Sequence, residues 1–84
     1  MCTGIIEKAE ISGSGKGARG WFKLEQVNVS YDHPVDAGLE HALNIDFVSP
    51  SIGPGARVAV ELDPASARKL VNAIMAALSE AENV

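Results

Sequence analysis

The sequence predicts a single α+β domain, in which a four-stranded, mainly antiparallel meander sheet has one C-terminal helix packed on one face. Three observations lead to this fold class. Apolar and polar residues alternate in four stretches, apolar residues recur at helical spacing over residues 64–81, and glycine-, proline- or polar-rich segments separate the first four stretches. Consecutive strands with short connections favour a meander, and a single amphipathic helix then covers one face of the sheet.

The first strand is predicted at residues 4–11, where the apolar residues fall mainly on one parity. Residues 12–20 read SGSGKGARG and hold four glycines with no large apolar residue, so they predict the loop of a flexible hairpin. The second strand is predicted at residues 21–31. Its apolar parity switches near Glu25, which indicates a bulge or a bend at that point.

Two shorter strands are predicted at residues 43–47 and 58–62, since large apolar residues alternate with polar or small residues in both segments. The helix is the clearest element. Asp63 is a favourable N-cap residue, because its carboxylate can accept hydrogen bonds from the free backbone N–H groups of the first turn. Pro64 suits the first helical position, where its missing N–H has no partner to lose.

Composition limits the function. The 84 residues form one domain over residues 1–84, with 46% hydrophobic and 21% charged residues. A net charge of −4 leaves no basic face for nucleic acid or an anionic membrane. No apolar stretch approaches the roughly 20 residues that span a bilayer and no signal peptide is expected, so the sequence predicts a cytoplasmic protein. A chain this small, with one cysteine, often gains its missing core from another copy, so we expect a homo-oligomer, either a dimer or a trimer.

The meander brings the candidate chemistry to one rim. The start of the first strand, the end of the second, the start of the third and the end of the fourth all meet there. The candidate site residues at this rim are Cys2, Tyr31, Asp32, His33, Glu40 and His41. A thiolate and two imidazoles suit zinc, copper or iron, so Cys2, His33 and His41 are the predicted ligands. Asp32 and Glu40 would be auxiliary carboxylates, and Tyr31 a hydrogen-bond donor.

Other interpretations of these residues stay open. Both histidines can be ordinary surface residues, with Cys2 at a disordered terminus. If Met1 is removed, the amine and the thiol of Cys2 could act together as a nucleophile or a chelate. In the glycine-rich segment, Lys16 and Arg19 could bind an anion, although the spacing does not match a P-loop.

Two hypotheses of function follow from these residues. The first is a protein that binds a transition metal or a small ligand at the rim, with or without catalysis. The second is a non-catalytic accessory subunit that docks a larger enzyme through its exposed sheet face. The sequence names no substrate and no reaction.

Six motifs support a resemblance that covers nearly the whole chain. These motifs are Met1-Cys2-Thr3, SGSGKG at residues 12–17, Gly20-Trp21-Phe22, Tyr31-Asp32-His33-Pro34, His41 with the following LNIDF, and RVAVEL at residues 57–62. Together they resemble a family of small bacterial proteins of unknown function. The resemblance implies a bacterial, cytoplasmic, single-domain protein, and it carries over no activity.

Overall fold

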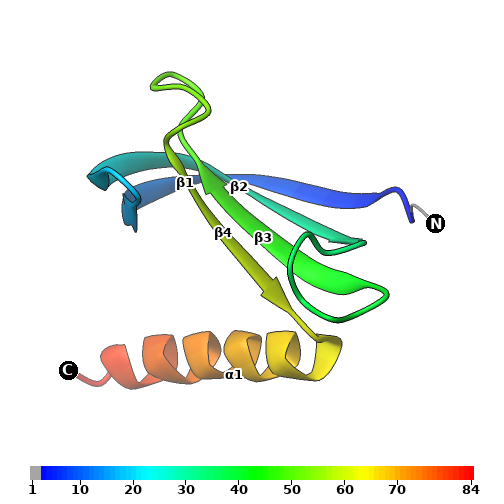
Figure 1. The fold of residues 1–84 in the computed structure, drawn as a ribbon. Helices are drawn as coiled ribbons and strands as arrows, with labels where there is room; N and C mark the ends of the chain where they lie inside the picture. The colour runs from blue at the N-terminus through cyan, green and yellow to red at the C-terminus, as the bar shows by residue number, and fades with distance from the viewer. Residues whose placement is uncertain (1–2) are drawn as a thin grey trace.

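The computed structural model describes residues 3–84 and confirms the predicted fold class. The sheet order follows the chain order and all strand pairs are antiparallel, as the meander predicts. Figure 1 shows the four strands and the helix, which are β1 (Ile5–Gly17), β2 (Gly20–Asp32), β3 (Ala42–Val48), β4 (Arg57–Leu62) and α1 (Pro64–Ala81). No helix within residues 3–84 is long and apolar enough to cross a membrane.

The glycine-rich segment is a strand for most of its length, so the prediction of a loop over residues 12–20 was wrong. β1 continues to Gly17, and only Ala18 and Arg19 form the turn into β2. Gly20 leaves the turn with a φ of 107°, a conformation that residues with a side chain rarely adopt. The segment was misread because strands that contain several glycines lack the alternation of side chains by which a strand is recognised.

The predicted irregularity near Glu25 is a bulge in the neighbouring strand. The pairing of β1 with β2 shifts between Glu10 and Gly13, so two residues of β1 lie opposite Glu25. An extra residue in one strand bends that strand and increases the local twist of the pair. The outer half of the β1–β2 hairpin therefore turns across β3 and β4, as Figure 1 shows.

The glycines of β1 allow this hairpin to approach β4, although the two strands are not hydrogen-bonded neighbours. A Cβ atom placed on Gly15 would lie 3.1 Å from Leu24 Cδ2 and 3.5 Å from Val58 Cγ2. A Cβ atom on Gly17 would lie 3.3 Å from the backbone oxygen of Arg57. The distances to Leu24 and to the Arg57 oxygen are tight, while that to Val58 is an ordinary van der Waals contact. The absence of side chains at these positions therefore lets the sheet curl on itself.

Two glycines of the same strand test this account. Gly15→Val is expected to lower the free energy of unfolding by about 1–3 kcal/mol, because the new side chain overlaps the position of Leu24. Gly13→Val is the matched control, since a Cβ atom there meets no atom within 4 Å. Its effect should stay within about 0.5 kcal/mol, as at an ordinary surface position. Urea unfolding of both variants measures the difference, and equal effects would contradict the tight packing around Gly15.

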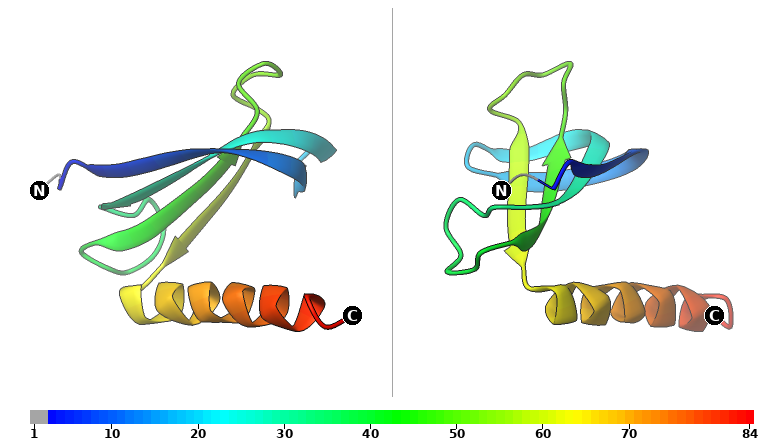
Figure 2. Two further views of the ribbon diagram at one scale, coloured as in Figure 1. Left: turned by 180° about the vertical axis from the view of Figure 1, so that it is seen from behind. Right: turned by 90° about the vertical axis from the view of Figure 1, so that its right-hand side faces the viewer.

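The helix begins and ends as predicted. Asp63 is the N-cap, Pro64 is the first helical residue, and the Asp63 carboxylate accepts a hydrogen bond of 2.7 Å from the backbone N–H of Ser66. The helix touches the sheet mainly at β3, however, and projects away from it in Figure 2. Within residues 3–84, α1 contributes no buried residue. The expected burial of its apolar side therefore does not occur within one chain.

The sheet has one apolar and one polar face, as the alternation predicts. By register, nine residues of β2, β3 and β4 share the apolar face, and every one of them is only half-buried; they are Val27, Val29, Tyr31, Leu43, Ile45, Phe47, Val58, Val60 and Leu62. The opposite face carries Asn28, Ser30, Asn44, Asp46 and Glu61. The buried residues of the described chain are few, namely Leu24, Ala42, Ser49 and Ala56.

Candidate functional site

The two histidines meet at the rim where the meander predicts them. Tyr31 is at the end of β2, and His33 and His41 lie at the two ends of the loop that leads to β3. The ring centroids of His33 and His41 are 4.9 Å apart, with an angle of 23° between the planes. The Tyr31 ring also stacks on His41, with 5.5 Å between the ring centroids and 20° between the ring planes. The three rings therefore form a continuous stack, which we call the histidine cluster.

A backbone hydrogen bond orients the first imidazole. His33 Nδ1 lies 2.8 Å from the carbonyl oxygen of Glu40. A carbonyl oxygen can only accept, so Nδ1 carries the proton and Nε2 carries the lone pair when the ring is neutral. This arrangement is common among histidines that bind metal ions or act as bases. The hydrogen bond from one ring nitrogen fixes the orientation of the ring and raises the basicity of the other nitrogen.

The loop between β2 and β3 is held by a carboxylate of β4. The Glu61 side chain accepts hydrogen bonds from the backbone N–H groups of Val35, Asp36 and Ala37, with oxygen–nitrogen distances of 2.5, 3.0 and 2.9 Å. These contacts join residues that are 24 to 26 positions apart in the chain. Glu61 thus fixes the middle of the loop whose two ends carry His33 and His41.

The same hydrogen bonds change the acidity of Glu61. The backbone N–H groups of Ala37 and Val35 stabilise the ionised carboxylate and hold its pKa below the ordinary value of 4.5, with a smaller contribution from Asp36. Burial opposes this shift only in part. Glu61 is therefore ionised at neutral pH, when its oxygens act as acceptors for all three N–H groups.

A buried amide supports the base of the loop. Asn44, opposite Glu61 on β3, donates from Nδ2 to the carbonyl oxygen of Asp32 at 3.4 Å. Its Oδ1 atom is buried and has no hydrogen-bond partner among residues 3–84. Asn44 and Glu61 thus support the start and the middle of the loop from neighbouring positions on the polar face of the sheet.

The remaining residues predicted for the rim site are Cys2, Asp32 and Glu40. Cys2 lies outside the described residues, so its place in the site stays a prediction. Asp32 accepts a 2.8 Å hydrogen bond from the backbone N–H of His33, and Glu40 contributes its carbonyl oxygen to the His33 ring. Within residues 3–84, no three side chains of His, Cys, Asp or Glu gather into a group that could hold a metal ion.

The predicted anion-binding residues are far from this rim along the strands. Lys16 pairs with Trp21 beside the turn of the β1–β2 hairpin, and Arg19 is in that turn, at the opposite end of β2 from Tyr31. The Arg19 guanidinium lies beside Gly55 of the β3–β4 connection. Since residues 13–17 pair with β2 as a strand, the hairpin that the sequence predicts is confirmed, while binding of an anion there stays a prediction.

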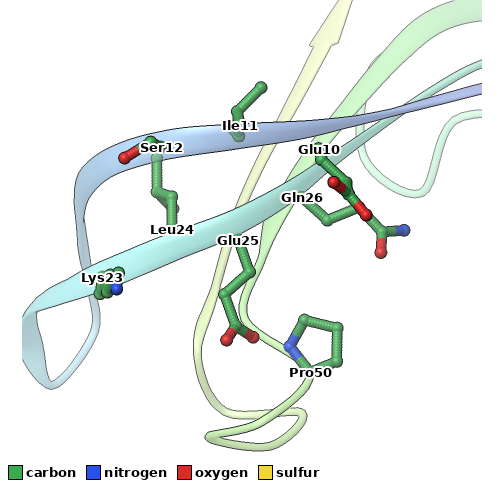
Figure 3. Close-up of a pocket in the computed structure, with 8 residues that line it drawn as sticks. All are labelled: Glu10, Ile11, Ser12, Lys23, Leu24, Glu25, Gln26 and Pro50. Atoms are coloured by element: carbon green, nitrogen blue, oxygen red, sulfur yellow. The ribbon is translucent and has the colours of Figure 1, made fainter.

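A hollow at the β1 bulge contains none of the predicted site residues. Figure 3 shows it lined by Glu10, Ile11, Ser12, Lys23, Leu24, Glu25, Gln26 and Pro50. The Glu25 carboxylate accepts hydrogen bonds from the backbone N–H and the hydroxyl of Ser51, at 3.0 and 2.6 Å. Gln26 donates to Asn28 at 2.6 Å. Glu25 thus joins β2 to the β3–β4 connection, and Gln26 bonds to another side chain of its own strand.

Sequence reasoning missed the two residues that position the loop. Asn44 and Glu61 alternate with apolar residues in β3 and β4, so they look like ordinary polar side chains on the outer face of a sheet. The sequence signal that could have identified Asn44 and Glu61 was their pairing across the predicted sheet. In the predicted meander they lie opposite one another near the rim that carries both histidines, where polar side chains can reach the loop.

The fold and the histidine cluster define a small α+β protein with an open antiparallel sheet and a loop that brings two imidazoles together. The sequence of residues 1–84 matches the family of unknown function DUF6295, and the chain belongs to this family. No curated protein and no solved structure matches the chain in the corresponding searches. The predicted resemblance to a family of unknown function is therefore confirmed, and the family assigns no activity.

Proposed function

We propose that this protein binds a transition metal ion or a small ligand at the histidine cluster, with Cys2 as a third protein ligand. The observation that carries this proposal is the 4.9 Å separation of the His33 and His41 rings. The two rings are stacked, 23° from parallel, so at least one imidazole has to rotate before both can bind one ion in the planes of their rings. At this centroid distance such a rotation can bring both rings to one ion, because bonds from zinc to histidine nitrogen are about 2.0–2.1 Å long. Zinc, copper and iron are the metals that suit two imidazoles and a thiolate.

The hydrogen bonds around the cluster support the proposal. The Glu40 carbonyl leaves the lone pair of His33 on Nε2, as a metal ligand requires. At the start of the chain, the Thr3 hydroxyl donates to the carbonyl oxygen of Tyr31, and Ile5 pairs with Tyr31 across the sheet. Cys2 directly precedes Thr3 in the sequence. In the proposed site, a carboxylate of Asp32 or Glu40, or a water molecule, completes the coordination.

Metal titration of untagged protein tests this function. Wild-type protein is expected to bind one zinc ion per histidine cluster in calorimetry, and His33→Ala or His41→Ala should weaken binding by about 100-fold or more. With Co²⁺ as the probe, Cys2→Ser should remove the absorption that a thiolate ligand produces. Glu80→Gln is the control, because Glu80 is an exposed acid on α1.

The outcomes are distinct. Circular dichroism of each variant separates loss of ligands from loss of fold. Wild-type protein that binds no zinc, copper or iron would contradict metal binding. Zinc binding that is unchanged in both histidine variants would place the ion elsewhere.

The alternative function is an accessory subunit that docks a larger enzyme. The exposed apolar residues of α1 favour some partner, since Ile74 is 51% exposed and Val71 is 58% exposed. A metal-free protein that co-purifies with one larger enzyme would support this alternative. The bacterial origin and the cytoplasmic location implied by the sequence motifs remain proposals in either case.

A further inference from the structure

Two apolar surfaces of the chain are exposed to solvent or only half-buried. One is the apolar face of the sheet defined above, in which all nine residues are half-buried. The other, which we call the helix stripe, consists of the exposed apolar residues Leu70, Val71, Ile74, Met75 and Leu78. Neither set contains a charged residue. A surface of this kind usually marks an interface.

The accessible surface area of the chain indicates how much surface such an interface could cover. The accessible surface is 6296 Å² for an 8.8 kDa chain. A compact monomer of this mass exposes about 4,800 Å², so the chain exposes about 1,500 Å² more than expected. The radius of gyration, 14.1 Å, also exceeds the value of about 12 Å for a compact domain of 84 residues. Figure 2 shows the reason, since α1 projects away from the sheet.

We infer that a second copy of this chain covers the helix stripe and the apolar face of the sheet, so that the protein is a two-fold symmetric homodimer. A standard interface buries about 800 Å² on each partner, and obligate homodimers bury more. The excess of about 1,500 Å² therefore matches a homodimer in which each chain completes the core of the other.

The chemistry of the two surfaces favours a second copy over another protein. A two-fold interface places the same patch of both chains in one contact, so a charge near the axis would face its own copy. The helix stripe and the apolar face carry no such charge. The few buried residues of a single chain, among them Leu24 and Ala42, form too small a core for an 84-residue domain without a partner.

Sedimentation equilibrium of the wild-type protein is the first test. We expect a mass of twice the 8.8 kDa chain at micromolar concentration. A chelator in the buffer prevents a metal ion from bridging two chains, so the result is independent of the proposed metal site. The thermal midpoint should rise with protein concentration, because dissociation accompanies unfolding. A folded monomer, an assembly of any number other than two, or a midpoint independent of concentration would overturn the proposal.

A pair of helix variants locates the contact. Ile74→Glu places a carboxylate in the helix stripe and should raise the dimer dissociation constant about 100-fold or more. Asn72→Glu is the matched control, because position 72 is on the opposite side of the same helix and should change the constant less than about threefold. Ile74→Glu with the dissociation constant of the wild type would overturn this placement. A monomeric wild-type protein that binds a different protein through α1 would identify another occupant of the surface and also overturn the proposal.

Discussion

Glu61→Gln is expected to release the loop between β2 and β3 and to lower the affinity of the histidine cluster for zinc about tenfold or more. The carboxylate accepts hydrogen bonds from three backbone N–H groups, at Val35, Asp36 and Ala37. An amide has only one acceptor oxygen, and its NH₂ group would face these donors. The loop would then lose the contact that fixes its middle, although both histidines remain.

Hydrogen exchange measures this release without reference to any metal. The amide protons of residues 35–37 should exchange faster in Glu61→Gln than in the wild type, while those of β3 should keep their protection. Glu7→Gln is the matched control, since Glu7 is an exposed residue of β1. Unchanged exchange at residues 35–37 would contradict the role of Glu61. Faster exchange with unchanged zinc affinity would show that the loop does not position the metal ligands.

The hydrogen bonds to Glu61 also affect how the stability of the fold depends on pH in acid. The pKa of Glu61 is lowered in the folded protein, mainly by the backbone N–H groups of Ala37 and Val35. The pKa values of Glu25 and Asp63 are lowered by hydrogen bonds from Ser51 and Ser66. A lowered folded-state pKa gives stability that is fully present above the unfolded value, near 4.5 for Glu61, and is lost as the pH falls through the folded value. In Glu61→Gln the loss of stability below this pH should therefore be less steep.

Leu24→Ala is expected to lower the free energy of unfolding by about 2–4 kcal/mol. Leu24 is the largest buried apolar residue of the described chain, with 9% of its surface exposed. Its side chain lies against Gly15 of β1, at the position where a Cβ atom on that glycine would also meet Val58 of β4. Removal of three carbon atoms would leave a cavity at the point where β1 and β4 meet.

Urea unfolding at fixed protein concentration measures this loss. Val35→Ala is the control, because Val35 is 95% exposed in the loop and the change should cost less than about 0.5 kcal/mol. A Leu24→Ala variant as stable as Val35→Ala would show that the contact between the hairpin and β4 contributes little to the fold.

Patterns over a few residues predicted most of the fold. Alternation located the strands, and Asp63-Pro64 located the start of α1, because N-cap chemistry depends on side chains within one helical turn. The meander also brought His33 and His41 together, since antiparallel pairing of neighbouring strands brings the ends of their connecting loop to one rim. These features could be predicted because each cause lies close to its effect along the chain.

Other features depend on residues that are distant in the sequence. The glycines of β1 look like a loop until β4 is seen beside Gly15 and Gly17, where an added side chain would contact or crowd that strand. Glu61 looks like an outward-facing strand residue until the loop at residues 35–37 is seen on its carboxylate. Neither contact leaves a periodic signal, because the curl of the sheet decides which residues meet.

The sequence by itself determined the elements, their antiparallel order and the meeting of the two imidazoles at one rim, because local propensity and hairpin connectivity suffice for these. Only the tertiary structure decided that the hairpin curls over β4, that Glu61 holds the loop, and that α1 keeps its apolar side exposed. Amphipathic spacing shows which side of a helix is apolar, but it does not show whether residues of the same chain bury that side. In this protein the bend of the sheet and the direction of α1 leave the apolar side of the helix exposed within one chain.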